Sequence, residues 1–128
     1  MLRKEEILNV SKLEPFKRYK YFIKKIADFE ELWTLKNDVG DLAISGADDK
    51  VLIAFWSAED FTNSCQNGVW ENYHPVKITM DELEEEILPM IREKGYLIDV
   101  FPVNNKSGFV VSIDEFVRDL NEELENYE

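Results

Sequence analysis

The sequence predicts an α+β layered domain, in which a mixed β-sheet of about six short strands is flanked by helices. Two observations favour this fold class. The hydrophobic period changes from helical to strand-like after Phe29, and Val51–Trp56 is apolar on both alternating faces, which is typical of a central strand covered on both sides. The expected order is α-α-β-β-β-α-β-α-β-β-α. No linker rich in Gly, Ser or Pro interrupts the chain, so we expect one domain over residues 1–128.

Two helices are predicted in the N-terminal third. The first covers Lys4–Val10, and the second begins near Pro15, because proline is favoured at the first position of a helix. The apolar stripe of the second helix consists of Phe16, Tyr19, Ile23 and Ile26. Its other faces carry Lys17, Arg18, Lys20, Lys24 and Lys25. We interpret these basic residues as a solvated face or as a surface that docks onto acidic neighbours.

Six strands are predicted at residues 31–36, 42–45, 51–56, 76–79, 96–103 and 109–112. Asp99 interrupts the fifth, an otherwise apolar segment. We expect its carboxylate to face solvent on an edge strand. The alternative is a buried carboxylate with a partner, which would mark a functional site.

Three helix starts share one pattern, a hydroxyl residue followed three positions later by an acid. The pairs are Ser57 with Asp60, Thr79 with Glu82, and Ser112 with Glu115. The hydroxyl accepts a hydrogen bond from a free backbone N–H, and the acid suits the positive end of the helix dipole.

Two further signals concern the later helices. Pro89 should kink or split the helix that follows Thr79, and Gly95 should end it. The inner stripe of the last helix consists of Ile113, Phe116, Val117, Leu120, Leu124 and Tyr127.

Three stretches of the chain resemble a known family. They are Arg18–Asp28, Phe55–Ser57 and the block from Trp70 to Pro102, followed by Gly108 and the terminal helix. Over about residues 15–125 the sequence is similar to an uncharacterised bacterial family catalogued as domain of unknown function family twenty-seven-fifty. The resemblance implies a small bacterial cytoplasmic domain, and it assigns an activity to no residue.

The charge excludes several classes of protein. Fifteen Lys and Arg stand against 27 Asp and Glu, a net charge of −12, and the excess of acid lies wholly in residues 37–128. This charge argues against nucleic-acid binding, because it repels a phosphate backbone. No apolar run approaches the ~20 residues that cross a membrane, and a charged N-terminus argues against export, so we expect a cytoplasmic protein. One Cys and one His cannot build a Cys/His zinc site, and the sequence contains no cofactor motif.

The first candidate site is the polar loop Gly68–Pro75, which holds Trp70, Tyr73 and His74. Loops with aromatic residues often bind ligands, so this loop is the candidate for a small-molecule site or a minor enzyme. The alternative is that Trp70 and Tyr73 cover the sheet edge or the helix kink. Cys65 follows Phe61 by four residues, and we expect its thiol to be buried; no motif supports pairing it with His74 as a nucleophile.

The second candidate site is the acidic end of the last helix, at Glu122, Glu123, Glu125 and Glu128. Negative charge there opposes the helix dipole, so helix energetics do not explain it. We interpret these residues as a surface for a basic partner, with a soluble tail as the alternative. The leading hypothesis is therefore a non-enzymatic interaction domain that binds a basic protein partner, as an immunity protein or inhibitor does.

Overall fold

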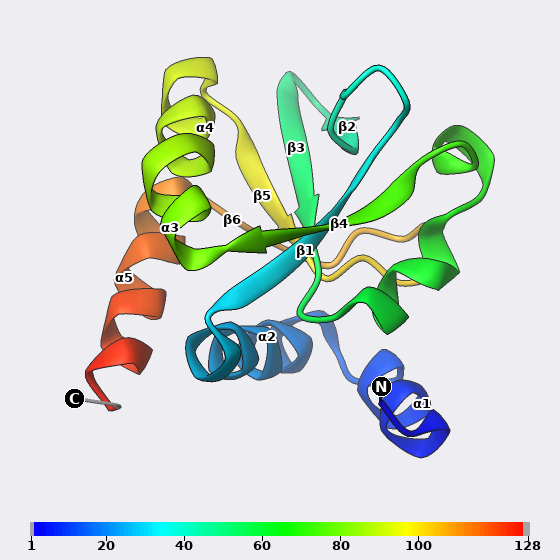
Figure 1. The fold of residues 1–128 in the computed structure, drawn as a ribbon, viewed down its shortest axis with the longest axis horizontal. Helices are drawn as coiled ribbons and strands as arrows, with labels where there is room; N and C mark the ends of the chain where they lie inside the picture. The colour runs from blue at the N-terminus through cyan, green and yellow to red at the C-terminus, as the bar shows by residue number, and fades with distance from the viewer. Residues whose placement is uncertain (1, 127–128) are drawn as a thin grey trace.

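The computed structural model describes residues 2–126, which fold into helices and strands (Figure 1). Tyr127 and Glu128, which the sequence analysis included, lie outside these residues. The helices are α1 (Lys4–Ser11), α2 (Pro15–Phe29), α3 (Met80–Glu82), α4 (Leu88–Lys94) and α5 (Ile113–Glu125), with the short helices η1 (Glu59–Cys65), η2 (Gly68–Trp70) and η3 (Leu83–Ile87). The strands are β1 (Glu31–Lys36), β2 (Ile44–Ala47), β3 (Lys50–Phe55), β4 (His74–Thr79), β5 (Leu97–Val100) and β6 (Phe109–Val111).

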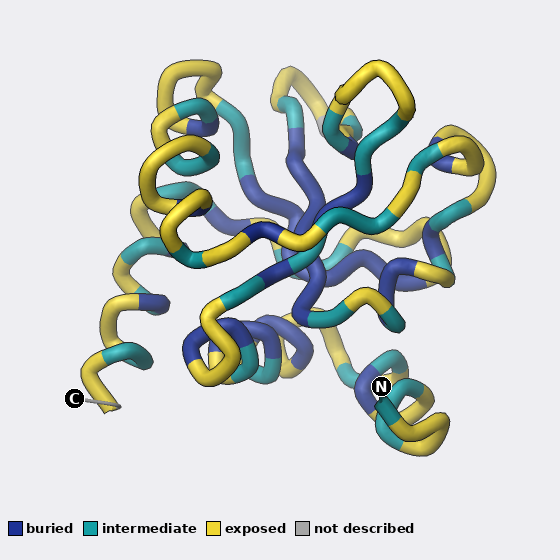
Figure 2. The backbone as a smooth tube through the Cα atoms, in the orientation of Figure 1, coloured by how far each residue is buried: buried dark blue, intermediate teal, exposed yellow. Residues whose placement is uncertain are grey.

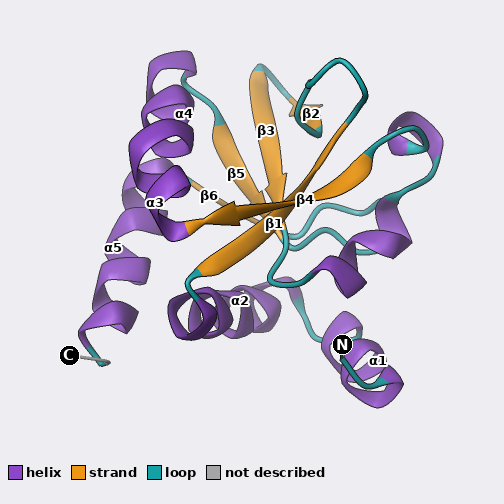
Figure 3. Cartoon of the chain, viewed as in Figure 1, coloured by secondary structure: helices purple, strands orange, loops and turns teal. Residues whose placement is uncertain are grey.

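The strands form two sheets. Strands β1 and β4 make an antiparallel pair, and the other sheet has the order β2-β3-β5-β6 with β3 and β5 parallel (Figure 3). One bridge joins the sheets: Trp33 and Trp56 exchange two backbone hydrogen bonds of 2.8 Å. The predicted α+β class with six strands is confirmed. The strands fall into two sheets because β1 meets the end of β3 only at this bridge and at a side-chain bond from Thr34 to the carbonyl of Ala54, whereas it pairs with β4 along its whole length.

Helices α2 and α5 pack against each other and against β5, with α2 also contacting β6. The buried hydrophobic residues form one cluster. Figure 2 shows that buried stretches of backbone run through the strands and along α2. The largest members of the cluster are Trp56, Phe22, Phe55, Phe101 and Phe116. This arrangement leaves α1 and η1 at one side of the molecule, in contact with each other.

The buried face of α2 includes Tyr19, Ile23 and Ile26 as predicted, and it differs from the predicted stripe at other positions. Phe16 is 52% exposed, whereas Phe22 is fully buried and Arg18 is 6% exposed. Arg18 is buried because its guanidinium finds main-chain acceptors: Nε donates to the carbonyl of Phe101 at 3.2 Å, and a second nitrogen donates to the carbonyl of Leu13. The prediction that placed Arg18 on the basic outer face was wrong.

Two of the three predicted helix starts are confirmed. The hydroxyls of Thr79 and Ser112 each accept a hydrogen bond of 3.1 Å from the backbone N–H three residues later. The glutamate at that later position accepts in return from the backbone N–H of Thr79 or Ser112. The third is wrong. Between Ser57 and Asp60 the chain forms no cap; η1 begins at Glu59 after an extended Ala58, and the Ser57 hydroxyl caps nothing.

The helix interruption near Pro89 is confirmed. A π-helical stretch, η3, separates α3 from α4, and Pro89 lies in the first turn of α4. Because proline lacks a backbone donor, the wider turn before it absorbs the missing hydrogen bond. Gly95 ends α4 in the left-handed conformation, with φ of 69°.

Asp99 is the main correction to the sequence analysis. Strand β5 lies between β3 and β6, and Asp99 is 2% exposed rather than solvent-facing. Its Oδ1 accepts the backbone N–H of Gly108 at 2.7 Å, and Ser107 bonds to the same carboxylate. Burial raises the pKa of Asp99, while these bonds and the charge of Arg18 oppose that rise.

The loop between β5 and β6 is tightly packed around that carboxylate. A Cβ atom at Gly108 would lie 1.9 Å from the carbonyl oxygen of Val100 and 2.6 Å from that of Phe101. Phe101 itself has φ of 66°, a conformation that costs energy for a residue with a side chain. The loop is therefore held by close contacts at Gly108 as well as by a turn in which Asn104 and Asn105 adopt the left-handed conformation that asparagine tolerates.

Candidate functional site

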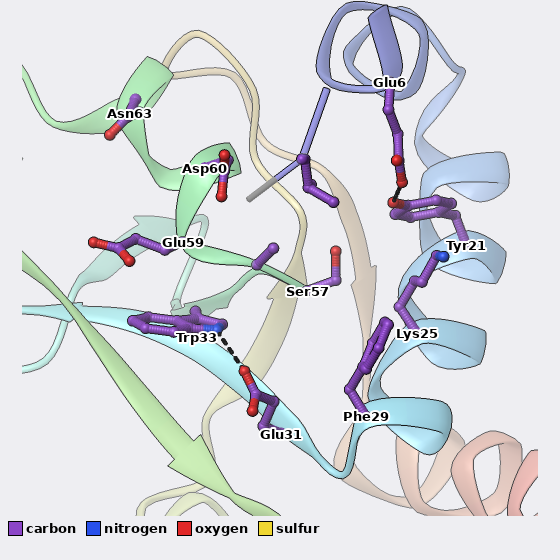
Figure 4. Close-up of a pocket in the computed structure, with 12 residues that line it drawn as sticks. Glu6, Tyr21, Lys25, Phe29, Glu31, Trp33, Ser57, Glu59, Asp60 and Asn63 are labelled. Atoms are coloured by element: carbon purple, nitrogen blue, oxygen red, sulfur yellow. Dashed lines mark hydrogen bonds between the residues drawn. The ribbon is translucent and has the colours of Figure 1, made fainter. Parts of the chain in front are cut away.

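A groove with a volume of about 780 Å³ lies between α1, the end of α2, the start of β1 and the start of η1 (Figure 4). We call it the N-terminal groove. It is lined by Leu2, Glu6, Tyr21, Lys25, Phe29, Glu31, Trp33, Ser57, Ala58, Glu59, Asp60 and Asn63.

The turn from α2 into β1 positions one wall of the groove. Glu30 adopts the left-handed conformation, with φ of 56°, and its N–H bonds to Ile26, so the helix stops and the chain reverses into β1. Side chains alternate along a strand. Leu32 points into the core, while Glu31 and Trp33 remain partly exposed and face the groove.

Helices α1 and α2 meet at the opposite wall. Tyr21 donates a 2.6 Å hydrogen bond to the carboxylate of Glu6. Burial is the main cause that raises the pKa of Tyr21 above its usual value, and this hydrogen bond is the second. The Lys25 ammonium lies 5.5 Å from the Tyr21 ring centre and 5.6 Å from that of Phe29. This wall therefore already holds one cation between two aromatic faces.

Ser57 supplies an unpaired polar group. The residue is 7% exposed, its hydroxyl points toward the groove in Figure 4, and its Oγ, which is itself buried, has no hydrogen-bond partner among the described residues. Leaving a buried hydroxyl unpaired costs about 1–3 kcal/mol. Polar groups in that condition are uncommon in folded proteins, so Ser57 is a place where an external group can bond.

The groove is acidic. Four carboxylates, from Glu6, Glu31, Glu59 and Asp60, line it against the single ammonium of Lys25. The Glu31 carboxylate accepts from the indole N–H of Trp33 at 3.2 Å, which orients the ring. Carboxylates around an aromatic face favour a positively charged ligand.

The acidic end of α5 lies in different surroundings. Glu122 and Glu123 line a second, smaller groove of about 410 Å³ between α2 and α5, which we call the α2–α5 groove; Glu125 is exposed and outside its lining. The lining carries three basic residues, Lys20, Lys24 and Arg118, and three acidic ones, Asp119, Glu122 and Glu123. Local charges therefore balance there. Partner binding by Glu122, Glu123 and Glu125 stays a prediction.

The three residues of the predicted aromatic loop are not gathered at one cavity. Trp70 is 7% exposed and packs edge-on against Trp56, with ring centres 6.1 Å apart. Tyr73 is half-buried, and its carbonyl accepts from Gln66. His74 is exposed at the start of β4, with Nε2 3.5 Å from a carboxylate oxygen of Asp38. Ligand binding at this loop stays a prediction.

Cys65 is fully buried, as predicted, and burial raises the pKa of its thiol. A buried thiol of raised pKa is a poor nucleophile. Together with Asp99 and Arg18 it belongs to an interior polar cluster whose members bond to the loops around them. None of the three residues lines the N-terminal groove or the α2–α5 groove.

Sequence reasoning missed the groove because its walls come from four separate segments. Trp33 was interpreted only as part of a strand, and Ser57 as a helix cap. One signal was available in Glu31–Lys36. Trp33 alternates with residues that are buried in the core, and this alternation places its indole on the opposite face of the strand. The docking of α1 beside that face could not be predicted from local pattern.

Metal and membrane chemistry have no visible support. No group of three or more His, Cys, Asp or Glu in residues 2–126 has the geometry to hold a metal ion. Within the same residues, no helix combines the length and apolar character needed to cross a bilayer.

These features define a class, an α+β domain with an acidic, aromatic groove at one side. A family model, described as protein of unknown function (DUF2750), matches residues 19–120, and the chain belongs to that family. The resemblance identified from the sequence is thereby confirmed. The matched region includes the groove residues from Tyr21 to Asn63, while Leu2 and Glu6 precede it. The sequence matches no curated protein.

Proposed function

We propose that this domain is a non-enzymatic binding protein for a basic protein partner, in the manner of an immunity protein or inhibitor, and that the N-terminal groove receives the partner. The observation that carries the proposal is the excess of carboxylates around aromatic faces and an unpaired Ser57 hydroxyl. The Ser57 hydroxyl can donate or accept, whereas the carboxylates beside it only accept, so together they favour a ligand that brings donors.

The whole-chain charge supports the same proposal. A net charge of −12 raises the rate at which a cationic partner meets the domain, and it repels nucleic acid that would compete for that partner. Cytoplasmic location belongs to this proposal, because an acidic inhibitor of a basic toxin acts where the toxin is made.

Two acidic surfaces compete for the partner, and their charge balance separates them. The N-terminal groove has four carboxylates and one ammonium, whereas the α2–α5 groove has equal numbers of each sign. A basic partner gains more from the first surface, since its charges are not already balanced.

The test is affinity purification from the source cell with three forms of the full chain as bait. They are the wild type, a Glu59→Gln/Asp60→Asn variant of the N-terminal groove and a Glu122→Gln/Glu123→Gln variant of the α2–α5 groove. Both variants lose two carboxylates, so their net charges match. We expect a basic protein on the wild type that is lost from the Glu59/Asp60 variant and kept by the Glu122/Glu123 variant.

Two results would overturn the proposal. Loss from the Glu122/Glu123 variant alone would place the partner on α5. Absence of any basic protein from the wild-type eluate would remove the basis for a basic partner. Retention on the wild type should also weaken as salt rises, because exposed charges are screened beyond about 10 Å at 0.1 M ionic strength.

A further inference from the structure

We infer that the N-terminal groove recognises an arginine side chain of the partner, whose guanidinium stacks on the indole of Trp33 and donates hydrogen bonds to Ser57 and the carboxylates beside it. The inference rests on the proposed function and names the group that the groove selects.

Trp33 is the tryptophan that the fold leaves available. Trp56 is fully buried and Trp70 is 7% exposed, whereas Trp33 is half-buried and lines the groove. The hydrogen bond from its indole to Glu31 holds the ring in place, so little side-chain freedom is lost when a ligand stacks on it. Tryptophan also offers the strongest aromatic face for a cation.

The other aromatic faces of the groove are already in use. Lys25 lies over both Tyr21 and Phe29. No cation of the described chain lies over Trp33. On one wall of the groove the aromatic rings are therefore covered by Lys25. On the facing wall the ring of Trp33 is free to contact a cation of the ligand.

The hydrogen-bond acceptors lie next to Trp33 because of the bridge between the sheets. Trp33 pairs with Trp56, so Ser57 is the next residue along, and Glu59 and Asp60 open η1 directly after it (Figure 4). These acceptors come from one side of the indole, while Glu31 approaches from its own strand.

Acceptors at several positions around one flat aromatic face select arginine over lysine. A guanidinium is planar, stacks on an aromatic ring and presents five N–H donors in a fixed fork, whereas an ammonium is a compact point charge with three donors. The Ser57 hydroxyl accepts one of these donors and thereby gains the partner that the free domain lacks.

The experiment compares two blocked peptides of equal charge, acetyl-Gly-Arg-Gly-amide and acetyl-Gly-Lys-Gly-amide, titrated into the full chain. The readout is the NMR signal of the Trp33 indole N–H, identified by its loss in Trp33→Phe, with the backbone amides of Ser57 and Glu59. We expect the arginine peptide to move these signals with about fivefold higher affinity than the lysine peptide. In Ser57→Ala the arginine peptide should bind about fivefold more weakly.

A matched control is the Glu122→Gln/Glu123→Gln variant, which should bind both peptides as the wild type does. Equal affinity for the two peptides at the same signals overturns the selection of arginine and leaves the basic partner standing. Movement confined to α5 signals, or no movement of the Trp33 signal, overturns the inference itself. The purification with three baits then decides the proposed function separately.

Discussion

Asp99 and Ser57 are both buried polar residues near the ends of neighbouring strands, and they differ in their hydrogen bonds. Asp99 accepts the Gly108 N–H and is enclosed by its own loop. Ser57 is buried almost as deeply, has no partner among the described residues and points into a groove. Burial of a polar group is therefore no sign of a site by itself; the unpaired group beside a cavity is the better indicator.

Gly108→Ala should have the largest effect, and it tests the loop that encloses the hydrogen-bonded Asp99. The new methyl group would overlap the main-chain oxygens of Val100 and Phe101, which have no freedom to move aside. We expect the free energy of unfolding to fall by about 4 kcal/mol or folding to fail, measured by urea denaturation.

Gly46→Ala is the control for this substitution. The nearest atom to a Cβ at Gly46 is a Lys50 oxygen at 3.9 Å, an ordinary contact, so the change should stay within about 1 kcal/mol. If both alanine variants were equally stable, the loop around Asp99 would be looser than its contacts indicate.

Asp99→Ala should have the next largest effect. It leaves the Gly108 N–H without its acceptor inside the protein, and we expect a loss of about 3 kcal/mol in the free energy of unfolding. Asp99→Asn keeps an oxygen at Oδ1 and should lose clearly less. Thermal and urea denaturation of the two variants measure the difference, and an Asp99→Ala variant as stable as the wild type would show that the bond contributes nothing.

The pH dependence of Asp99 has a definite sign. Burial raises its pKa in the folded state above the unfolded value of about 3.9. Between the two pKa values the folded chain binds more protons than the unfolded chain, so this group's contribution to stability is full below the unfolded pKa and is lost as the pH rises through the folded pKa.

Comparing the wild type with Asp99→Asn separates the pH-dependent contribution of Asp99 from the contributions of the other carboxylates. We expect the stability of the wild type relative to Asp99→Asn to be greatest in acid and to decline toward neutral pH. Urea unfolding of both proteins over a series of pH values measures it. A relative stability that rises with pH would mean that Arg18, rather than burial, dominates the carboxylate's environment.

Local patterns predicted much of the fold. The hydroxyl and acid pairs at Thr79 and Ser112 mark real helix starts, and Pro89 marks a real interruption, because each acts within one or two turns of chain. Arg18 was misplaced because one of its main-chain acceptors, Phe101, lies 83 residues along the chain, and Asp99 because the strands on either side of β5 were not known from the sequence. A charged residue looks exposed until its neighbours in the fold are known.

The same limit applies to the candidate site. Ser57 and Asp60 have the spacing of a helix cap, and only the structure shows an extended Ala58 and an unpaired hydroxyl between them. Trp33 becomes a binding face only once α1 and η1 lie beside β1. The sequence analysis allowed acidic neighbours for the lysines of α2, but it did not predict that the acidic end of α5 supplies them.

Ser57→Ala gives the smallest effect and the sharpest test of the comparison. Removing an unpaired buried hydroxyl should raise the free energy of unfolding by about 1 kcal/mol, while binding of the arginine peptide weakens. Thr34→Val is the matched control, because Thr34 is buried too but its hydroxyl donates to the carbonyl of Ala54 at 2.8 Å. That variant should lose about 1 kcal/mol, measured by the same urea denaturation. If the free energy of unfolding rises in Ser57→Ala and falls in Thr34→Val, the Ser57 hydroxyl serves binding and the Thr34 hydroxyl serves folding. A loss of stability in Ser57→Ala would show instead that the Ser57 hydroxyl stabilises the fold.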